Sequence, residues 1–493
     1  MSAHPQGLVP AATRHKGLTS TLERETKLSI DATFQLPKLP GKLLHPRVMT
    51  STYYDTPDHR LAHARITLRR RVEKGGSLWQ LKIPAINGRR ELEIAGGPGH
   101  PPRVLQELLT ALLRGKTMVP LVTMRTVRTG IRVIGATGPV ADVVVDVVVV
   151  LKEGRVVHRF RELEIEWLHG DEAVEQSLEQ TLRKAGAGDH DGRSKLFQAL
   201  GRLGRPAAPP AEAPIADHLA FLFGQRVRAL LAADPGTRLG GQIEDLHQMR
   251  VAIRRLRALL RAARPLLKPE WVDPLRIELN WLGGLLGPAR DLDVQIAYFQ
   301  EEATTFRSSD RRPLERFVEH LRRERESAQQ TLLEGLKSAR YMRLITTLVR
   351  STRALPVVAS GATLHDIAAA QFKKLRKAVN DLSRSPTNEE LHQVRIRTKR
   401  ARYAAELAQA CLGKPAARFA NQARKFQDLL GVHQDAVLAE DYVRALVART
   451  KGVRMAFVAG RMVERQRQRR DDARAALASY WKKLKRRGKQ AWS

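Results

Sequence analysis

The sequence predicts an α+β protein of two parts, an antiparallel β-sheet followed by an all-α helical bundle. Up to about residue 204, apolar and polar side chains alternate with the period of two that is typical of strands. After a stretch rich in Pro and Ala at 205–214, the period becomes 3.6 and stays helical to the end of the sequence. A length of 493 residues also favours more than one domain.

The chain carries a large positive charge, and most of it belongs to the second part. Lys and Arg number 86 against 51 Asp and Glu, a formal charge of +35. Residues 1–200 hold 30 of these basic and 21 of these acidic residues, which leaves +26 for residues 201–493. Such a surface favours a polyanionic partner, which could be nucleic acid, an anionic membrane or a phosphate polymer.

Cysteine usage and hydropathy exclude several classes of protein. Cys411 is the only cysteine, so an intramolecular disulfide and a thiolate metal site are excluded. Residues 1–18 contain Pro and Gly and lack the apolar core of a signal peptide, so we expect a mobile leader there. No run reaches the roughly 18 apolar residues of a membrane span. The predicted location is the cytoplasm.

The first predicted strand contains the motif on which the functional prediction depends. In Glu23-Arg24-Glu25-Thr26-Lys27, side chains two positions apart share a face, so Glu23, Glu25 and Lys27 point the same way. Two carboxylates and an ammonium group would suit a charged site. The alternative is an exposed edge strand that carries an ion pair.

Seven further strands follow, which makes about eight in an antiparallel arrangement. A turn at Gly75-Gly76 joins two of them as a hairpin. Two helical stretches, 102–115 and 178–185, accompany the sheet. The expected strands are Thr52–Pro57, Ile66–Val72, Leu78–Ile83, Arg89–Ile94, Val122–Ile134, Ala141–Leu151 and Arg159–Leu168.

The polar face of these strands carries both acids and bases, strand after strand. A solvated sheet face would tolerate this pattern, but if the sheet closes into a barrel the charges line a lumen. Carboxylates could hold divalent cations, and Arg and Lys could hold phosphate groups. The acids are Glu23, Glu25, Glu91, Glu93, Asp146, Glu162, Glu164 and Glu166. The bases are Lys27, Arg69, Arg71, Lys82, Arg125, Arg128 and Lys195.

Residues 20–200 resemble the CYTH domain, also called the triphosphate tunnel metalloenzymes. The resemblance rests on the Glu23-x-Glu25-x-Lys27 start, Tyr53-Tyr-Asp-Thr, Leu68-Arg-Arg-Arg71 and the charged positions that follow them. It implies an eight-stranded antiparallel tunnel that hydrolyses inorganic triphosphate, thiamine triphosphate or nucleoside triphosphates, or cyclises ATP, with Mg²⁺ or Mn²⁺. No charge is missing among the matching positions.

The resemblance also implies a role for each matching residue. Phosphate groups would be bound by Lys27, Arg69, Arg71, Lys82, Arg125, Arg128 and Lys195. Metal would be held by Glu23, Glu25, Asp146, Glu164 and Glu166, while Glu23, Glu25 and Lys27 form the catalytic motif. We expect cations to neutralise charge on the phosphate oxygens while a water attacks the terminal phosphorus in line, with no nucleophilic side chain.

The second part contains an internal repeat. Leu246-His247-Gln248-Met249-Arg250 returns 145 positions later as Leu391-His392-Gln393-Val394-Arg395. The turn at Leu285-Leu286-Gly287 likewise returns as Leu429-Leu430-Gly431. We therefore expect two related helical halves in one bundle.

Each copy carries a basic stripe along one helix face. His247, Arg250, Arg254 and Arg257 fall at spacings of 0, 3, 7 and 10, and Arg261 extends them. An apolar stripe that includes Met249 and Leu256 lies beside them and should face the core. Like charges along one face destabilise a helix unless a bound polyanion compensates. The alternative is a solvated arginine-rich face. The second copy supplies His392, Arg395, Lys399 and Arg402 in register, and Lys373, Lys374, Arg376 and Lys377 could extend the patch.

Residues 216–485 resemble the CHAD domain, the conserved-histidine α-helical domain, through both His-x-x-Arg-x-x-x-Arg/Lys-x-x-Arg helices and the Leu-Leu-Gly turns. The resemblance implies a helical bundle that binds inorganic polyphosphate through His247, Arg250, Arg254, Arg257, His392, Arg395, Lys399 and Arg402. The two domains in this order are a known bacterial arrangement. The expected domains are a leader at 1–18, CYTH at 19–204, a linker at 205–214, CHAD at 215–485 and a basic tail at 486–493.

Together these patterns predict a metal-dependent inorganic triphosphatase with a polyphosphate-binding domain, which could associate with polyphosphate granules. Three alternatives stay open: a non-catalytic binder of such granules, a nucleoside triphosphatase or adenylate cyclase of the same fold, and a nucleic-acid binder. Aromatic residues make up only 5% of the chain and do not alternate with the basic stripes, which disfavours stacking on single strands. The exact substrate, preferred metal, pH optimum and oligomeric state do not follow from the sequence.

Overall fold

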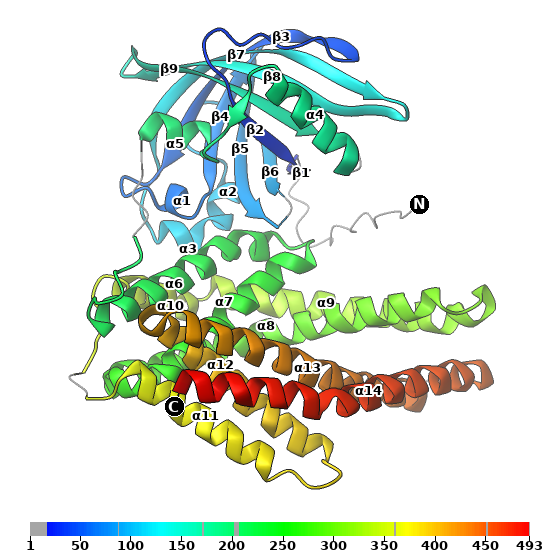
Figure 1. Cartoon of the computed structure of the whole chain (residues 1–493). Coiled ribbons are helices and arrows are strands. Elements are labelled where there is room, and N and C mark those ends of the chain that lie inside the picture. The colour runs from blue at the N-terminus through cyan, green and yellow to red at the C-terminus, as the bar shows by residue number, and fades with distance from the viewer. Residues whose placement is uncertain are drawn as a thin grey trace. The chain divides into compact units, whose positions relative to one another are not determined.

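A computed structural model describes residues 17–86, 88–169, 172–201, 207–358, 361–449 and 452–492. These form two compact units: one holds the residues up to 201 together with Arg228–Met249, and the other holds Ala207–Val227 together with the chain from Arg250 onward. An antiparallel sheet in the first part and helices in the second confirm the α+β prediction (Figure 1). The predicted leader lies outside the described residues except for residues 17 and 18. So do residues 205 and 206 of the predicted linker, whose described remainder, 207–214, contains no helix or strand.

Within the described part of the chain, the sheet has ten strands rather than the eight that were predicted. Arg24 interrupts the first predicted strand and divides it into β1 and β2, and a two-residue strand joins the sheet near the end of the domain. The alternation continues through Arg24 and so gives no sign of the break, and a two-residue strand is too short to show an alternation. The strands are β1 (Thr19–Glu23), β2 (Glu25–Ser29), β3 (Gly41–Asp55), β4 (Thr67–Glu73), β5 (Gly76–Ala85), β6 (Gly88–Ala95), β7 (Val119–Gly135), β8 (Gly138–Lys152), β9 (Arg155–Trp167) and β10 (Gly188–Asp189).

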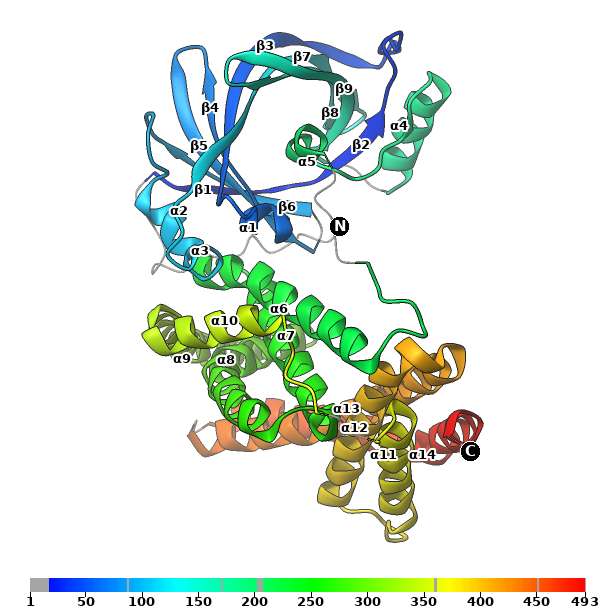
Figure 2. The same ribbon diagram turned by 90° about the vertical axis from the view of Figure 1, so that its left-hand side faces the viewer.

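The strand order brings the two ends of the sheet together at Arg24. The order is β1-β6-β5-β4-β3-β7-β8-β9-β2-β10, and neighbouring strands pair in antiparallel orientation. Because β1 pairs with β6 while β2 pairs with β9, the segment 19–29 belongs to both ends. Figure 2 shows the sheet curved into a ring. One face of every strand therefore turns toward a common interior.

The sheet is charged on its inner face and apolar on much of its outer face. On β9, Glu162 and Glu164 are buried inside, and the intervening Leu163 and Ile165 are buried outside. The outer residues belong to a core cluster completed by Leu178 and Leu182 of α4 (Glu172–Lys184). This helix covers part of the outer face. A second apolar cluster, which includes Tyr53, Met124 and Leu196 of α5 (Lys195–Leu200), lies on the inward-facing side beside the charged groups. The remaining short helices of this unit are α1 (Arg60–His63), α2 (Arg103–Leu108) and α3 (Thr110–Leu113).

Asp55 fixes the turn that follows β3. Its side chain is fully buried and accepts hydrogen bonds from the backbone N–H groups of Thr56, Leu61 and Ala62, at 2.6, 2.9 and 2.9 Å. These are donors at the start of α1, which would otherwise lack partners. The aspartate of the Tyr-Tyr-Asp-Thr stretch is therefore structural.

We expect Asp55→Ala to lower the free energy of unfolding by about 3 kcal/mol, because it leaves buried N–H groups without acceptors. Urea denaturation followed by circular dichroism measures the change. Asp58→Ala is the matched control: Asp58 is exposed, and its carboxylate interacts with Arg60 at 2.9 Å and with the Thr56 side chain, so the expected loss is below about 0.5 kcal/mol. Equal losses for the two variants would contradict the assigned role of Asp55.

The second part is built from long helices. Two of them, α8 and α13, run for 36 residues each and α14 runs for 40. The helices are α6 (Ile215–Leu239), α7 (Ile243–Ala262), α8 (Pro269–Thr304), α9 (Ser308–Lys337), α10 (Ala339–Ser351), α11 (Leu364–Asn380), α12 (Asn388–Leu412), α13 (Lys414–Arg449) and α14 (Val453–Trp492), with a 3₁₀ turn at Arg264–Leu266.

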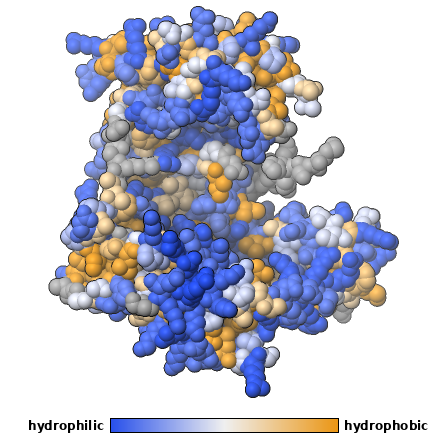
Figure 3. Space-filling view, viewed as in Figure 1, coloured by the Kyte–Doolittle hydropathy of each residue, from blue (hydrophilic) through white to orange (hydrophobic). Residues whose placement is uncertain are grey.

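Apolar residues from α8, α9, α13 and α14 form one core of this part, which includes Phe299, Leu314, Val443 and Met462. On α7 the predicted apolar stripe is confirmed, since Met249 and Leu256 are fully buried. The visible face of the helical part is largely hydrophilic (Figure 3). Its surplus of basic residues thus lies on helices whose other faces form the core.

The last helix continues through most of the stretch that was expected to be a basic tail at 486–493. Helix α14 ends at Trp492, whose side chain is buried with its ring centroid 5.4 Å from that of Phe419. Gly488, one turn earlier, lies against Phe372: a Cβ there would come within 2.2 Å of the ring. The spacing of Leu484, Gly488 and Trp492 puts one face of this segment in the core. The many charged residues of the segment make this face difficult to recognise in the sequence.

Candidate functional site

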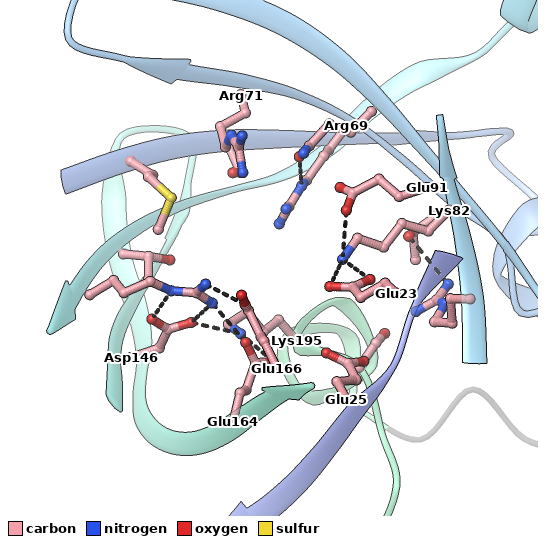
Figure 4. Close-up of a pocket in the computed structure, with 18 of the residues that line it drawn as sticks. Glu23, Glu25, Arg69, Arg71, Lys82, Glu91, Asp146, Glu164, Glu166 and Lys195 are labelled. Carbon is pink, nitrogen blue, oxygen red and sulfur yellow. Dashed lines mark hydrogen bonds and ion pairs between the residues drawn. The ribbon is translucent and has the colours of Figure 1, made fainter. Parts of the chain in front are cut away.

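The interior of the β-sheet unit contains a cavity with about 880 Å³ of empty space. Its described lining includes eight Lys or Arg side chains and seven Asp or Glu side chains, so opposite charges nearly balance. The basic ones are Lys27, Arg47, Arg69, Arg71, Lys82, Arg89, Arg128 and Lys195. The acidic ones are Glu23, Glu25, Glu91, Glu93, Asp146, Glu164 and Glu166. Figure 4 shows ten of these side chains around an open centre.

One wall of the cavity holds a buried cluster of carboxylates. Oxygens of Asp146, Glu162 and Glu164 lie within 4.8 Å of one another, on the adjacent strands β8 and β9. The Arg128 guanidinium donates to both oxygens of Asp146 at 2.8 Å and to Glu164 at 2.7 Å. Lys195, at the start of α5, also reaches Asp146 at 2.9 Å. Like charges can stay this close because basic groups lie among them.

The pKa values follow from burial and from these neighbours. Burial favours the neutral form of Glu164, but the charges of Lys195, Lys27 and Arg128 outweigh it and hold its pKa well below the usual range. Burial also disfavours the charged form of Lys195, yet Asp146, Glu164 and Glu162 raise its pKa well above the ordinary value. Glu164 is therefore a carboxylate and Lys195 an ammonium group at neutral pH.

Across the cavity, Lys82 of β5 bridges two acids. Its ammonium group donates to both oxygens of Glu23, at 2.7 and 2.5 Å, and lies 3.6 Å from Glu91. Glu91 keeps its other oxygen, Oε1, buried and without a hydrogen-bond partner among the described residues. An acceptor of this kind is suited to a cation or a donor that enters the cavity.

The wall formed by β3, β4 and β5 presents arginines that are weakly paired. Arg69 donates to the Gln80 amide oxygen at 2.6 Å and to the Tyr53 hydroxyl at 3.0 Å, and no described carboxylate lies within 4.0 Å of it. Arg71 lies 3.7 Å from Glu93 and has a buried Nε without an acceptor. Burial, reinforced by the charge of Arg69, lowers the pKa of Arg71. These guanidinium groups can bind an anion, whereas those near Asp146 already have carboxylate partners.

The acids present fit a hard divalent cation, the metal type that the predicted ligands require. The donors are carboxylate oxygens, Glu164 is ionised, and Glu91 offers an unpaired oxygen. All five predicted ligands, Glu23, Glu25, Asp146, Glu164 and Glu166, line the cavity. Which of these five acids bind the metal, and which have other roles, stays a prediction. Glu162 was not among these five, but it belongs to the tightest carboxylate cluster.

Of the predicted phosphate-binding residues, Lys27, Arg69, Arg71, Lys82, Arg128 and Lys195 line the cavity, and Arg125 does not. Arg125 is exposed. It lies three positions from Arg128 on the continuous strand β7, and an odd separation puts two side chains on opposite faces of a strand. Grouping the two was therefore wrong.

Arg47 was not among the predicted site residues, because the predicted strand began only at Thr52. Strand β3 starts at Gly41 and places Arg47, Met49, Ser51 and Tyr53 in the cavity, in the alternation that strands require. Arg47 donates to both oxygens of Glu73, at 2.7 and 2.6 Å. Extending the alternation back from Tyr53 would have identified this residue.

A second candidate site is a basic cleft in the helical part, with about 1680 Å³ of empty space. Its described lining contains nine Lys or Arg side chains and no Asp or Glu. Most come from α7 and α12, which are the two helices of the predicted repeat. The basic residues are Arg250, Arg254, Arg257, Arg261, Lys374, Arg395, Arg397, Lys399 and Arg400.

The charges in the cleft are poorly compensated. Burial, together with the charges of Arg395 and Arg254, lowers the pKa of Lys399 to about 8. The Nε atoms of Arg395 and Arg400 are buried and lack a hydrogen-bond partner among the described residues. Arg250 lies 3.2 Å from Asp291, outside the lining. A surplus of buried donors and positive charge favours an anionic ligand.

Five of the eight residues predicted to bind polyphosphate line this cleft: Arg250, Arg254, Arg257, Arg395 and Lys399. His247, His392 and Arg402 do not. The ring of His392 contacts the Gln434 amide oxygen at 2.8 Å, and Arg402 stacks on Tyr403 at 4.4 Å. Arg397 and Arg400 were missed because they lie beside the stripe in the sequence; only the packing of α11 and α12 turns them into the cleft.

Residues 21–195 match the family model of the CYTH domain, and residues 222–444 match that of the CHAD domain. Two uncharacterized proteins of Mycobacterium tuberculosis, from strains CDC 1551 and H37Rv, are each 28% identical over 472 residues, which is 87% of this chain and 90% of theirs. None of the described helices is long and apolar enough to cross a membrane.

Two solved structures are similar to parts of the chain. PptA from Streptomyces chartreusis is 22% identical, with 55% of this chain and 100% of that chain covered and a TM-score of 0.45. The CHAD domain of the plant Ricinus communis is 24% identical, with 56% and 94% covered and a TM-score of 0.45. The two family matches follow one another in the predicted order and fall on the cavity and on the cleft. The chain thus contains a CYTH domain at residues 21–195 followed by a CHAD domain at residues 222–444.

Proposed function

We propose that the CYTH cavity hydrolyses inorganic triphosphate with Mg²⁺ or Mn²⁺, and that the CHAD cleft binds inorganic polyphosphate. The proposed hydrolysis rests on one observation: different walls of the cavity carry different kinds of charged group. Weakly paired arginines on β4 lie on one wall, and a buried cluster of carboxylates lies on another. A chain of phosphates that carries divalent cations needs both. The curved sheet then forms the tunnel of its family, completed by β1 and β2.

The residues have distinct parts in the proposed reaction. Arg69 and Arg71 bind phosphate oxygens, and Lys82 orients Glu23. A cation held by Glu23, Glu25, Asp146, Glu164 and Glu166 would neutralise charge on the phosphate oxygens. Water attacks the terminal phosphorus in line and the bridging P–O bond breaks, which gives diphosphate and phosphate. No nucleophilic side chain is required.

The lining favours inorganic triphosphate over a nucleotide. Among its described residues, only Met49 and Tyr53 offer an apolar or aromatic side chain against which a base could pack, and the Tyr53 hydroxyl already accepts from Arg69. A nucleotide site ordinarily provides an apolar slot for the base. A nucleoside triphosphatase or adenylate cyclase is therefore the second candidate.

The test is release of phosphate from inorganic triphosphate and from ATP, each with Mg²⁺, Mn²⁺ or excess chelator, with cyclic AMP measured in parallel. We expect metal-dependent turnover of triphosphate, about tenfold or more faster than that of ATP. Faster cleavage of ATP, or formation of cyclic AMP, would favour the nucleotide alternative. No turnover of either, with polyphosphate still bound, would leave a non-catalytic polyphosphate-binding protein.

Polyphosphate is the proposed ligand of the cleft because nine cations without a carboxylate suit a linear chain that carries one charge per phosphate. The two helices α7 and α12 would contribute one copy each of the internal repeat. The same chemistry supports association with polyphosphate granules. Nucleic acid is the competing polyanion, and duplex DNA in the same binding assay distinguishes the two.

The affinity for polyphosphate should depend on pH through Lys399. Its pKa is about 8 in the free cleft, and a bound anion would raise it. The positive charge of Lys399 then contributes fully to polyphosphate binding below pH 8. The affinity weakens as pH rises through 8 toward the higher pKa of the complex. We expect about a tenfold loss of affinity between pH 7.5 and 9.5, from linkage. Fluorescence anisotropy with labelled polyphosphate measures it. Lys399→Arg stays charged and should flatten the profile; an unchanged slope would show that Lys399 is not the group involved.

A further inference from the structure

Basic side chains of the protein already hold the carboxylate cluster of the cavity. The Lys195 ammonium group lies 2.9 Å from Asp146 and 2.8 Å from Glu164, and it also contacts Glu162. The Lys27 ammonium group contacts Glu164 and lies 3.2 Å from Glu162 and 3.5 Å from Glu25. A divalent cation that approaches Asp146 and Glu164 therefore meets two ammonium groups beside these carboxylates. Figure 4 shows Lys195 beside Asp146 and Glu164.

The two lysines can move away from the carboxylates more readily than Arg128 can. The Arg128 guanidinium is fixed by a two-pronged contact with Asp146 and by a further bond to Glu164. A lysine ammonium group is a compact charge on a flexible stem, so it can exchange one set of oxygens for another. A phosphate chain in the cavity would offer such oxygens. Without that chain, moving either lysine takes a positive charge away from buried carboxylates and gives nothing in return, which is unfavourable.

Glu162 is placed to keep the lysines in the cavity when they move. Its Oε1 contacts both ammonium groups, and its Oε2 accepts a hydrogen bond from the Gln198 amide at 2.8 Å. Gln198 lies on α5, the helix that also carries Lys195. Glu162 is therefore engaged at both oxygens, which makes it a positioning residue for the lysines rather than a cation ligand.

We propose that Lys27 and Lys195 occupy the cation position of the free cavity and release it only when a phosphate chain binds. The divalent cation and the phosphate chain then bind with mutual dependence: each raises the affinity for the other by the same factor. This inference rests on the proposed triphosphate substrate. It adds that the free protein binds the cation weakly, and that its own lysines are the reason.

The experiment measures Mn²⁺ binding by electron paramagnetic resonance of the unbound ion, which needs no turnover. In the absence of phosphate, Lys27→Met and Lys195→Met should each bind Mn²⁺ about tenfold more tightly than the wild type. Lys184→Met is the matched control: Lys184 is exposed on α4, so the variant removes the same charge without vacating the cluster. It should change the affinity less than about twofold.

A second measurement uses the wild type alone, in case a variant does not fold. Imidotriphosphate, which is not hydrolysed at the bridging position, should tighten Mn²⁺ binding about tenfold or more, after subtraction of the same titration without protein. Equal Mn²⁺ affinity with and without the analogue, at concentrations where the analogue binds, would overturn the inference. So would folded lysine variants that bind Mn²⁺ no better than Lys184→Met. If the analogue does not bind at all, the proposed function fails, and the phosphate-free variants still decide the inference.

Discussion

Replacing Arg69 with Met should lower kcat/KM for inorganic triphosphate about a thousandfold, a loss of about 4 kcal/mol in transition-state stabilisation. Arg69 lies among the cavity residues with its guanidinium on Gln80 and Tyr53, and no described carboxylate lies within 4.0 Å of it. A guanidinium in this setting can make several charge-assisted hydrogen bonds to phosphate oxygens, which are the strong ones. Initial rates of phosphate release at varied triphosphate concentration measure the effect.

Arg125→Met is the control. The sequence pattern grouped Arg125 with Arg69, so this variant tests whether that pattern or the structure identifies the residues that bind substrate. Arg125 is exposed and does not line the cavity, so its replacement should change kcat/KM less than about threefold. Similar large losses for both variants would mean that Arg125 reaches the substrate and that the cavity is not the site. Circular dichroism of both variants excludes unfolding as the cause.

The alternation of side chains predicted most of the cavity because a strand has only two faces. Glu23, Glu25 and Lys27 share a face in the sequence pattern and line the cavity in the structure. The prediction failed where it departed from that rule, as with Arg125, or where the strand was cut short, as with Arg47. The interruption at Arg24, which lets one segment pair at both ends of the sheet, depends on long-range closure that local sequence does not specify.

In the helical part, spacing predicted the residues of one helix face but not what faces them. Arg250, Arg254 and Arg257 repeat at helical intervals and line the cleft together. Arg397 and Arg400 line it as well, because α12 also meets the cleft beside its predicted stripe. Which part of a helix surface borders a cleft depends on the packing of its neighbours, and a single-helix pattern contains no information on that. For the same reason His247 and His392 recur with the stripe without lining the cleft.

Neutralising two cleft arginines should nearly abolish polyphosphate binding at moderate salt. In the double variant Arg254→Gln/Arg395→Gln, one charge is lost from α7 and one from α12, and both side chains line the cleft. Each contact with a phosphate releases a bound counterion, so affinity should fall about a hundredfold or more at 0.15 M salt, and the slope of log K against log salt should decrease by about two. Fluorescence anisotropy with labelled polyphosphate across a salt series measures both quantities.

The matched control removes two charges from the same domain without touching the cleft. Lys373 and Lys377 lie on α11 and are exposed, whereas Lys374 between them lines the cleft. The variant Lys373→Gln/Lys377→Gln has the same net charge as the cleft variant, so it reports the long-range field alone, which salt at this concentration screens beyond about 8 Å. We expect a loss below about threefold. If the two double variants lose affinity equally, polyphosphate associates with the whole basic surface, and the cleft is not a distinct site. A large loss in the cleft variant alone would instead show that cations of α7 and α12 act together on one phosphate chain.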